Sequence, residues 1–163
     1  MKQLNLLSHF NFNYSNAEHA YIFSTDDDVN YFVTFLEYQH VMDVEFPIYS
    51  FIIDRYPENK KSKDLQNKIR NTILIILSNF FENNQSALVA IYDSLDGKQL
   101  YRKKLFNKWY NEFNGGIIKK KEGKFKANNE ETYAIAIYSS NHQFCSEIEE
   151  KFEKLLKKNF YNE

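Results

Sequence analysis

Apolar residues follow two different spacings along this chain, and these spacings predict where strands and helices lie. Alternation of apolar with polar residues is typical of strands, and it indicates strands or hairpins over residues 20–25, 29–35, 45–54, 117–126 and 132–139. Spacings of three and four are typical of amphipathic helices, and they predict helices over residues 64–83, 98–113 and 140–156. The unbroken apolar run 87–92 indicates an interior strand.

This order of elements predicts an α+β fold. We expect a single domain with a largely antiparallel sheet of about five to seven strands and three helices packed mainly on one face. Parallel pairing around residues 87–92 stays open. Residues 1–19 have little periodicity and are expected to form a loosely ordered N-terminal arm or a short edge strand, whereas residues 20–163 form the α+β domain. Residues 117–126 are expected to form a short basic hairpin that turns at Glu122-Gly123.

The predicted helix 98–113 carries an arginine on its apolar side. At about 100° per residue, one half of this helix holds mostly aromatic and aliphatic residues, namely Tyr101, Leu105, Phe106, Trp109, Tyr110 and Phe113. Arg102 falls in the middle of that half. A buried guanidinium costs several kcal/mol unless a carboxylate neutralises it. The nearest acids in sequence are Asp93 and Asp96, so we predict that one of them pairs with Arg102.

The same two aspartates have a chemical interpretation. Asp93 and Asp96 follow a predicted interior strand and precede a helix, where α/β enzymes often bind a divalent metal. A metal site needs further ligands, and no His-x-x-x-His, second Asp pair or Gly-rich phosphate loop lies nearby in the sequence. A structural turn is the simpler interpretation, and we expect no metal and no cofactor.

Charge is unevenly distributed along the chain although the net charge is only -1. Residues 1–54 carry one Lys against eight Asp and Glu, whereas residues 98–126 carry ten Lys and Arg against two Glu. The lysines expected to contact a partner are Lys103, Lys104, Lys108, Lys119, Lys120, Lys121 and Lys124. If the helix and the hairpin are neighbours, these lysines form one positive surface for an acidic partner or for phosphates. A solvated face is the simpler explanation of the same residues.

The cysteine content and the lengths of the apolar runs indicate the compartment in which the protein is expected. Cys145 is the only cysteine, so no disulfide forms within one chain and a reducing, cytoplasmic compartment is expected. The N-terminal residues lack the apolar stretch of a secretory signal, and the longest aliphatic run, 73–77, is far too short to cross a bilayer. We therefore expect no membrane association.

The segment Tyr92-Asp93-Ser94-Leu95-Asp96-Gly97-Lys98-Gln99, followed by Arg102, Phe106 and Trp109, resembles a family of small bacterial proteins described only as a domain of unknown function, family 6169. The alternating residues of 21–25 and 31–35 resemble the N-terminal hairpin of that family. Tyr92 stands where the family is expected to favour Cys. The resemblance implies no activity, substrate or catalytic residue. It implies that the turn and the helix after it are the shared feature of the family.

Three hypotheses about function follow. The first is a non-enzymatic cytoplasmic interaction module that docks a macromolecular partner, most naturally a protein, through the basic helix and hairpin or through the acidic N-terminal sheet. The second is a metal-dependent enzyme that acts on nucleic acid or a nucleotide through Asp93 and Asp96. The third is nucleic-acid binding without catalysis, in which Tyr101 or Tyr110 stacks on bases. The first is preferred because no catalytic spacing is found, and the protein is therefore expected not to be an enzyme.

Overall fold

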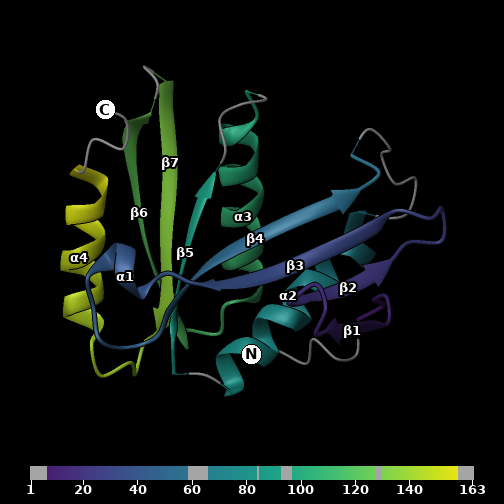
Figure 1. Ribbon diagram of the computed structural model, residues 1–163, viewed down its shortest axis with the longest axis horizontal. Helices are drawn as coiled ribbons and strands as arrows, with labels where there is room; N and C mark the ends of the chain where they lie inside the picture. Colours follow the sequence, from purple (N-terminus) through teal and green to yellow (C-terminus); the bar gives the residue numbers. More distant parts are fainter. Residues whose placement is uncertain (1–6, 59–65, 84, 93–96, 128–129, 158–163) are drawn as a thin grey trace. The chain divides into compact units, whose positions relative to one another are not determined.

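The computed structural model contains one mixed sheet with helices packed on it (Figure 1), and it describes residues 7–58, 66–83, 85–92, 97–127 and 130–157. In chain order, the elements found in these residues are β1 (Phe12–Ser15), β2 (Ala20–Ser24), β3 (Asn30–Glu37), α1 (Gln39–Met42), β4 (Ile48–Tyr56), α2 (Gln66–Asn83), β5 (Ala87–Tyr92), α3 (Gln99–Phe113), β6 (Ile118–Ala127), β7 (Glu130–Ser139) and α4 (Cys145–Lys157). The strand order is β1-β2-β3-β4-β5-β7-β6.

The sheet confirms the predicted α+β class. Seven strands pair mostly antiparallel, and β4 and β5 pair parallel through the register Ile48↔Ala87. The chain segment between these two strands contains α2, as a parallel connection requires, since a tight hairpin joins only antiparallel strands. The described residues contain four helices instead of the predicted three, because the four-residue α1 was not expected. Within residues 1–19, Phe12–Ser15 form the edge strand β1.

The chain divides into two compact units, which are described one at a time. The first unit comprises residues 1–36 and 51–84, and aromatic rings dominate its core. Phe23 stacks on Phe10 on one side and on Tyr31 on the other, with ring centroids 5.9 and 5.0 Å apart. The Phe80 ring of α2 stacks on the Phe35 ring of β3. Helix α2 also fixes the segment before β1, because Thr72 Oγ1 accepts a hydrogen bond from the Phe10 amide.

The second unit comprises residues 37–50 and 85–163. Its main core lies between α4 and the strands β5 and β7, where Ile148, Phe152 and Leu155 pack on Val89 and Ala136. Successive side chains of a strand point to opposite faces. Odd-numbered residues of β6 contact α4, since Lys121 pairs with Glu153, whereas even-numbered residues contact α3, since Lys120 bonds to Asn107. Helices α3 and α4 therefore cover opposite faces of β6 and β7.

The predicted hairpin within residues 117–126 is wrong. Strand β6 continues through Glu122 and Gly123 without a turn and pairs along its whole length with β7, from Ile118↔Ser139 to Ala127↔Glu130. The last pair of this ladder is Ala127↔Glu130, well beyond the predicted turn. Gly123 has a packing role instead, because a Cβ atom there would overlap the Cδ1 methyl of Leu156. The glycine lets α4 approach the strand.

No helix within the described ranges has the length and apolar character needed to span a membrane.

Candidate partner-binding surface

Helix α3 and strand β6 lie side by side and are joined by polar side chains. The Lys120 ammonium donates a hydrogen bond to Asn107 Oδ1 at 2.5 Å. The Tyr110 hydroxyl donates to the Ile118 carbonyl at 2.6 Å. One turn nearer the start of α3, Lys103 Nζ lies 3.5 Å from a carboxylate oxygen of Glu122 and 4.5 Å from the centre of the Tyr133 ring. The basic helix and the lysine-rich segment are therefore neighbours, which is the condition on which one positive surface depended.

Glu122 is the centre of this polar layer. Its two oxygens contact two lysines, Lys120 at 2.8 Å and Lys103 at 3.5 Å. Burial alone would raise the pKa of this carboxyl group. The hydrogen bond and charge of Lys120, with the charge of Lys103, outweigh burial and lower the pKa below its ordinary value. Two of the seven predicted lysines, Lys103 of α3 and Lys120 of β6, are therefore already neutralised in part by Glu122 of β6.

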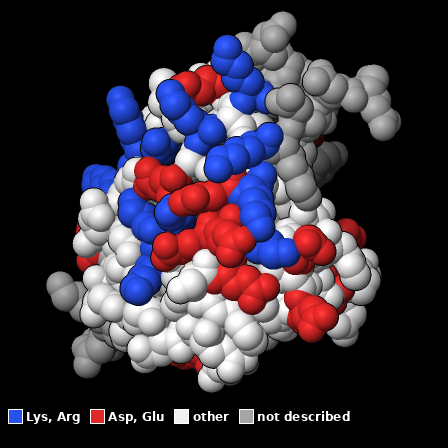
Figure 2. All heavy atoms as spheres, turned by 90° about the vertical axis from the view of Figure 1, so that its left-hand side faces the viewer, with Lys and Arg blue, Asp and Glu red and all other residues white. Residues whose placement is uncertain are grey.

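Lys121, a lysine of β6 that faces away from α3, is also close to acids. Lys121 Nζ lies 2.7 Å from Glu153 and 3.9 Å from Glu149, both on α4. The same Glu149 accepts a hydrogen bond from the hydroxyl of Tyr138. Figure 2 views this side of the molecule and shows acidic side chains between the lysines. The lysines therefore do not form one continuous positive surface.

The remaining predicted lysines are the more accessible ones. Lys104, Lys108, Lys119 and Lys124 are exposed. Lys124 pairs with Glu131 at 2.7 Å, and Glu131 also accepts the hydrogen bond of the Tyr133 hydroxyl. Within the described residues, no acid lies within ion-pair distance of Lys104, Lys108 or Lys119. These three lysines keep their full charge available to a partner.

The outward face of α3 combines charge with exposed apolar surface. Lys104 and Lys108 each follow by one position a residue that contacts β6, which turns them about 100° toward solvent. Leu100 and Tyr101 lie on the same side of the helix, 51% and 63% exposed. The prediction that Tyr101 belongs to the buried half is therefore wrong. The side of α3 that faces the sheet carries Lys103, Phe106, Asn107 and Tyr110, because β6 offers Glu122 and Lys120 as polar partners.

Arg102 is half-buried and is not an unpartnered side chain. Asp93 and Asp96 lie outside the described residues, so the predicted ion pair between one of them and Arg102 stays a prediction, and the metal site on the two aspartates stays an alternative hypothesis. Among the residues that are described, no group of three or more His, Cys, Asp or Glu side chains is placed to hold a metal ion.

Sequence reasoning missed an unsatisfied polar atom at the end of β5. The hydroxyl of Tyr92 is buried beneath α3, with the ring 6.4 Å from that of Phe106, and it has no hydrogen-bond partner among the described residues. Burial raises the pKa of Tyr92, and the negative charge of Glu122 raises it further. A tyrosine is common at such a position in a strand, so the sequence contained no signal for this feature.

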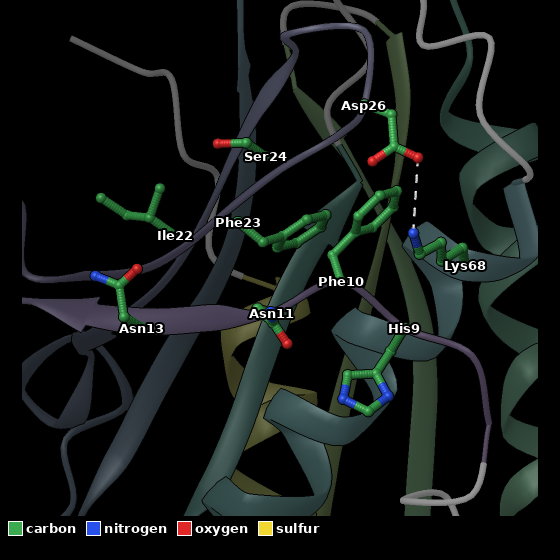
Figure 3. A pocket seen from close by; sticks show the side chains of 9 residues that line it. All are labelled: His9, Phe10, Asn11, Asn13, Ile22, Phe23, Ser24, Asp26 and Lys68. Carbon is green, nitrogen blue, oxygen red and sulfur yellow. Dashed lines mark ion pairs between the residues drawn. The ribbon is translucent and has the colours of Figure 1, made fainter.

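The first unit contains a concave site that the sequence did not predict (Figure 3). It is a hollow of about 350 Å³ beside β1 and β2, lined by His9, Phe10, Asn11, Asn13, Ile22, Phe23, Ser24, Asp26 and Lys68. Lys68 Nζ lies 4.0 Å from the centre of the Phe10 ring and 3.7 Å from Asp26. The Lys68 ammonium thus lies close to both an aromatic ring and a carboxylate. The hollow itself is open to solvent. Nothing in its lining selects one class of ligand.

Comparison with protein-family models gives one match: residues 65–154 match the model of a family of unknown function, DUF6169. The matched segment begins just before α2 and ends within α4, so it includes α3, β6 and the residues between β5 and α3. Comparisons with curated proteins and with solved structures find no match.

Proposed function

Because this chain belongs to the DUF6169 family, whose function is unknown, we propose from its own geometry that it is a non-enzymatic interaction module of the cytoplasm that docks an acidic protein partner. The docking surface is the outward face of α3 (Leu100, Tyr101, Lys104 and Lys108), continued by the exposed lysines of β6. A cytoplasmic location is supported by the single cysteine.

One observation carries this proposal. Lys104 and Lys108 are exposed lysines without an acidic partner among the described residues, and they share a helix face with two large exposed apolar side chains. Apolar anchors surrounded by charges are typical of protein interfaces, in which the charges steer the partner and the anchors stabilise the complex.

Nucleic acid fits this surface less well. Phosphate binding is strengthened by many unneutralised cations along one groove, since each contact releases counterions. Here Glu122, Glu131, Glu149 and Glu153 lie among the lysines and would repel phosphates. Tyr110, one of the two tyrosines expected to stack on bases, donates its hydroxyl to the backbone and has the Lys120 ammonium over its ring. Tyr101 alone keeps an exposed ring.

The test is a capture experiment with charge-matched variants. Tagged wild-type protein is compared with a Lys104→Glu/Lys108→Glu variant in host lysate with and without nuclease treatment, and captured proteins are quantified by mass spectrometry. The control is Lys154→Glu/Lys157→Glu, which makes the same charge change on exposed positions of α4. We expect an acidic partner that the α3 variant loses at least tenfold and the α4 variant retains. Equal capture by all three proteins would contradict the proposal, and loss of the partner on nuclease treatment would favour nucleic acid.

A further inference from the structure

Strand β6 is an edge of the sheet, since among the described strands it pairs only with β7. An edge strand presents a row of unpaired backbone groups to which another extended segment can bind. The hydrogen-bond pattern shows which groups these are. The Ser140 amide donates to the Ile117 carbonyl at 2.7 Å, so residues 117 and 140 form a hydrogen-bonded pair. In an antiparallel ladder such pairs recur at every second residue.

It follows that residues 119, 121, 123 and 125 bond to β7, while the backbone groups of the even-numbered residues point away from the sheet. Ile118, the first even-numbered residue of β6, supports this assignment because its backbone groups bond to the side chain of Asn114. The Ile118 amide donates to Asn114 Oδ1 at 3.1 Å, and the Ile118 carbonyl accepts from Asn114 Nδ2 at 2.7 Å. The side chain of Asn114 thus bonds the edge as an added strand would, but at one residue only.

Beyond Ile118, the outward backbone groups belong to Lys120, Glu122, Lys124 and Lys126. No hydrogen bond to these groups is found within the described part of the chain. The strand therefore offers a row of donors and acceptors about seven residues long, from 120 to 126. This length suits a short peptide, since strands in proteins are usually five or six residues long.

Charge indicates what can occupy this edge. The ten residues of β6 contain five lysines and one glutamate, a net charge of +4. Lysines on an edge oppose pairing with a second copy of the same edge, because like charges would lie directly opposite one another. The lysines of β6 that no described acid neutralises favour a strand that carries acidic side chains on both faces, since Lys119 lies on one face of β6 and Lys126 on the other.

We propose that the acidic partner of this protein binds as an extended segment that adds to β6 as an eighth strand. This inference rests on the proposed function, because it specifies how the same partner is held. The backbone of residues 120–126 provides the hydrogen bonds, and the lysines of β6 select acidic side chains in the segment.

The direct test uses synthetic peptides and the full chain. One ten-residue peptide repeats Glu-Glu-Thr-Thr, which places glutamates on both faces of an extended strand, and a second has the same side chains but N-methyl groups on alternate backbone nitrogens. Binding is followed by NMR of the ¹⁵N-labelled protein. We expect the first peptide to bind and to slow hydrogen exchange of the amides of 120, 122, 124 and 126. The N-methylated peptide should bind at least tenfold more weakly, because it keeps the charge and loses the strand hydrogen bonds.

Several outcomes would overturn the inference. Equal binding of the two peptides would mean that charge alone holds the ligand. Absence of binding by the acidic peptide would also reject strand addition. Slow exchange of the even-numbered amides in the protein alone, with a dimer in solution, would show that a second copy occupies the edge.

A pair of variants separates this inference from the proposed function. Lys124→Pro removes an outward N–H without removing a bond to β7, and Lys124→Ala makes the same charge change but keeps that N–H. We expect the proline variant to lose the captured partner about tenfold relative to the alanine variant. If both retain it while Lys104→Glu/Lys108→Glu loses it, the docking surface is right and strand addition is wrong. If no variant loses it, both proposals fail.

Discussion

The strands β6 and β7 are covered by one helix on each face, and the two faces are built from different chemistry. Beneath α4, Ile148, Phe152 and Leu155 pack on small and aromatic residues of the sheet, and Gly123 lets the helix reach the edge strand. Beneath α3, Phe106 packs near the ring of Tyr92 in β5, and the edge strand β6 meets the helix with Lys120 and Glu122. The first face supplies the burial that stabilises the fold, whereas the second holds a helix through polar contacts that depend on exact partners.

The largest effect is expected at the centre of the α4 face. Phe152 is completely buried, so Phe152→Ala should lower the free energy of unfolding by about 3 to 5 kcal/mol, the usual cost of emptying such a site. The matched change beneath α3 is Phe106→Ala. Because Phe106 is only half-buried, this change should lower the free energy of unfolding clearly less. Urea unfolding followed by circular dichroism measures both. Equal losses would show that the two faces contribute alike to stability.

The glycine of β6 provides a second test of the α4 face. A side chain at position 123 would displace Leu156, so Gly123→Val should lower stability by about 1 to 3 kcal/mol, as overpacking does. Shortening Leu156 to Ala should remove this overlap and restore part of the lost stability. We therefore expect the double variant with Leu156→Ala to lose less than the sum of the two single changes, as measured by thermal unfolding. Strict additivity would mean that Gly123 and Leu156 do not meet.

On the α3 face, the pH dependence of stability tests the contribution of the Glu122 charge. Glu122→Gln should cost about 1 kcal/mol at pH 7, since both lysine partners remain partly in water. Because the pKa of Glu122 is lowered in the folded state, its contribution is present above the ordinary value of about 4.5 and is lost as the pH falls through the lowered value. The wild-type and variant stabilities should therefore converge in acid. A difference that stays constant between pH 7 and pH 3 would contradict the role of the charge.

The smallest expected effect is an increase in stability. Tyr92→Phe removes a buried hydroxyl that has no partner, and it should raise stability by up to about 1 kcal/mol. Tyr110→Phe is the matched control, because the Tyr110 hydroxyl donates to Ile118 and its removal should lower stability by a similar amount. Differential scanning calorimetry compares the two. A loss of stability in Tyr92→Phe would indicate that this hydroxyl has a bonding partner in solution.

Much of the fold could be predicted from local patterns. The strand 87–92 and the long helices follow from the spacing of their apolar residues, and so does the α+β class. The turn predicted at Glu122-Gly123 was wrong because a glycine after a charged residue is typical of a turn and equally of a strand in close contact with a helix. The local sequence is the same in both cases, and the contact with Leu156 involves a residue 33 positions away.

The orientation of α3 could not be predicted for a related reason. Helical spacing placed Tyr101 on the buried side because aromatic residues were assumed to seek the core. The neighbouring strand instead presents Lys120 and Glu122, so Lys103 and Asn107 face the sheet and Tyr101 faces solvent. A periodicity argument assumes that the surface a helix covers is apolar, and here it is not.

The sequence by itself determined most of the segments that become strands and helices and the unequal distribution of charge, with ten Lys and Arg in residues 98–126. Only the tertiary structure decided which of those lysines are neutralised and which strand is left with an unpaired edge. The physical reason is that secondary structure depends on residues a few positions apart, whereas ion pairs and strand order depend on residues that folding brings together. Lys121 and Glu153, 32 positions apart and 2.7 Å from each other, illustrate that difference.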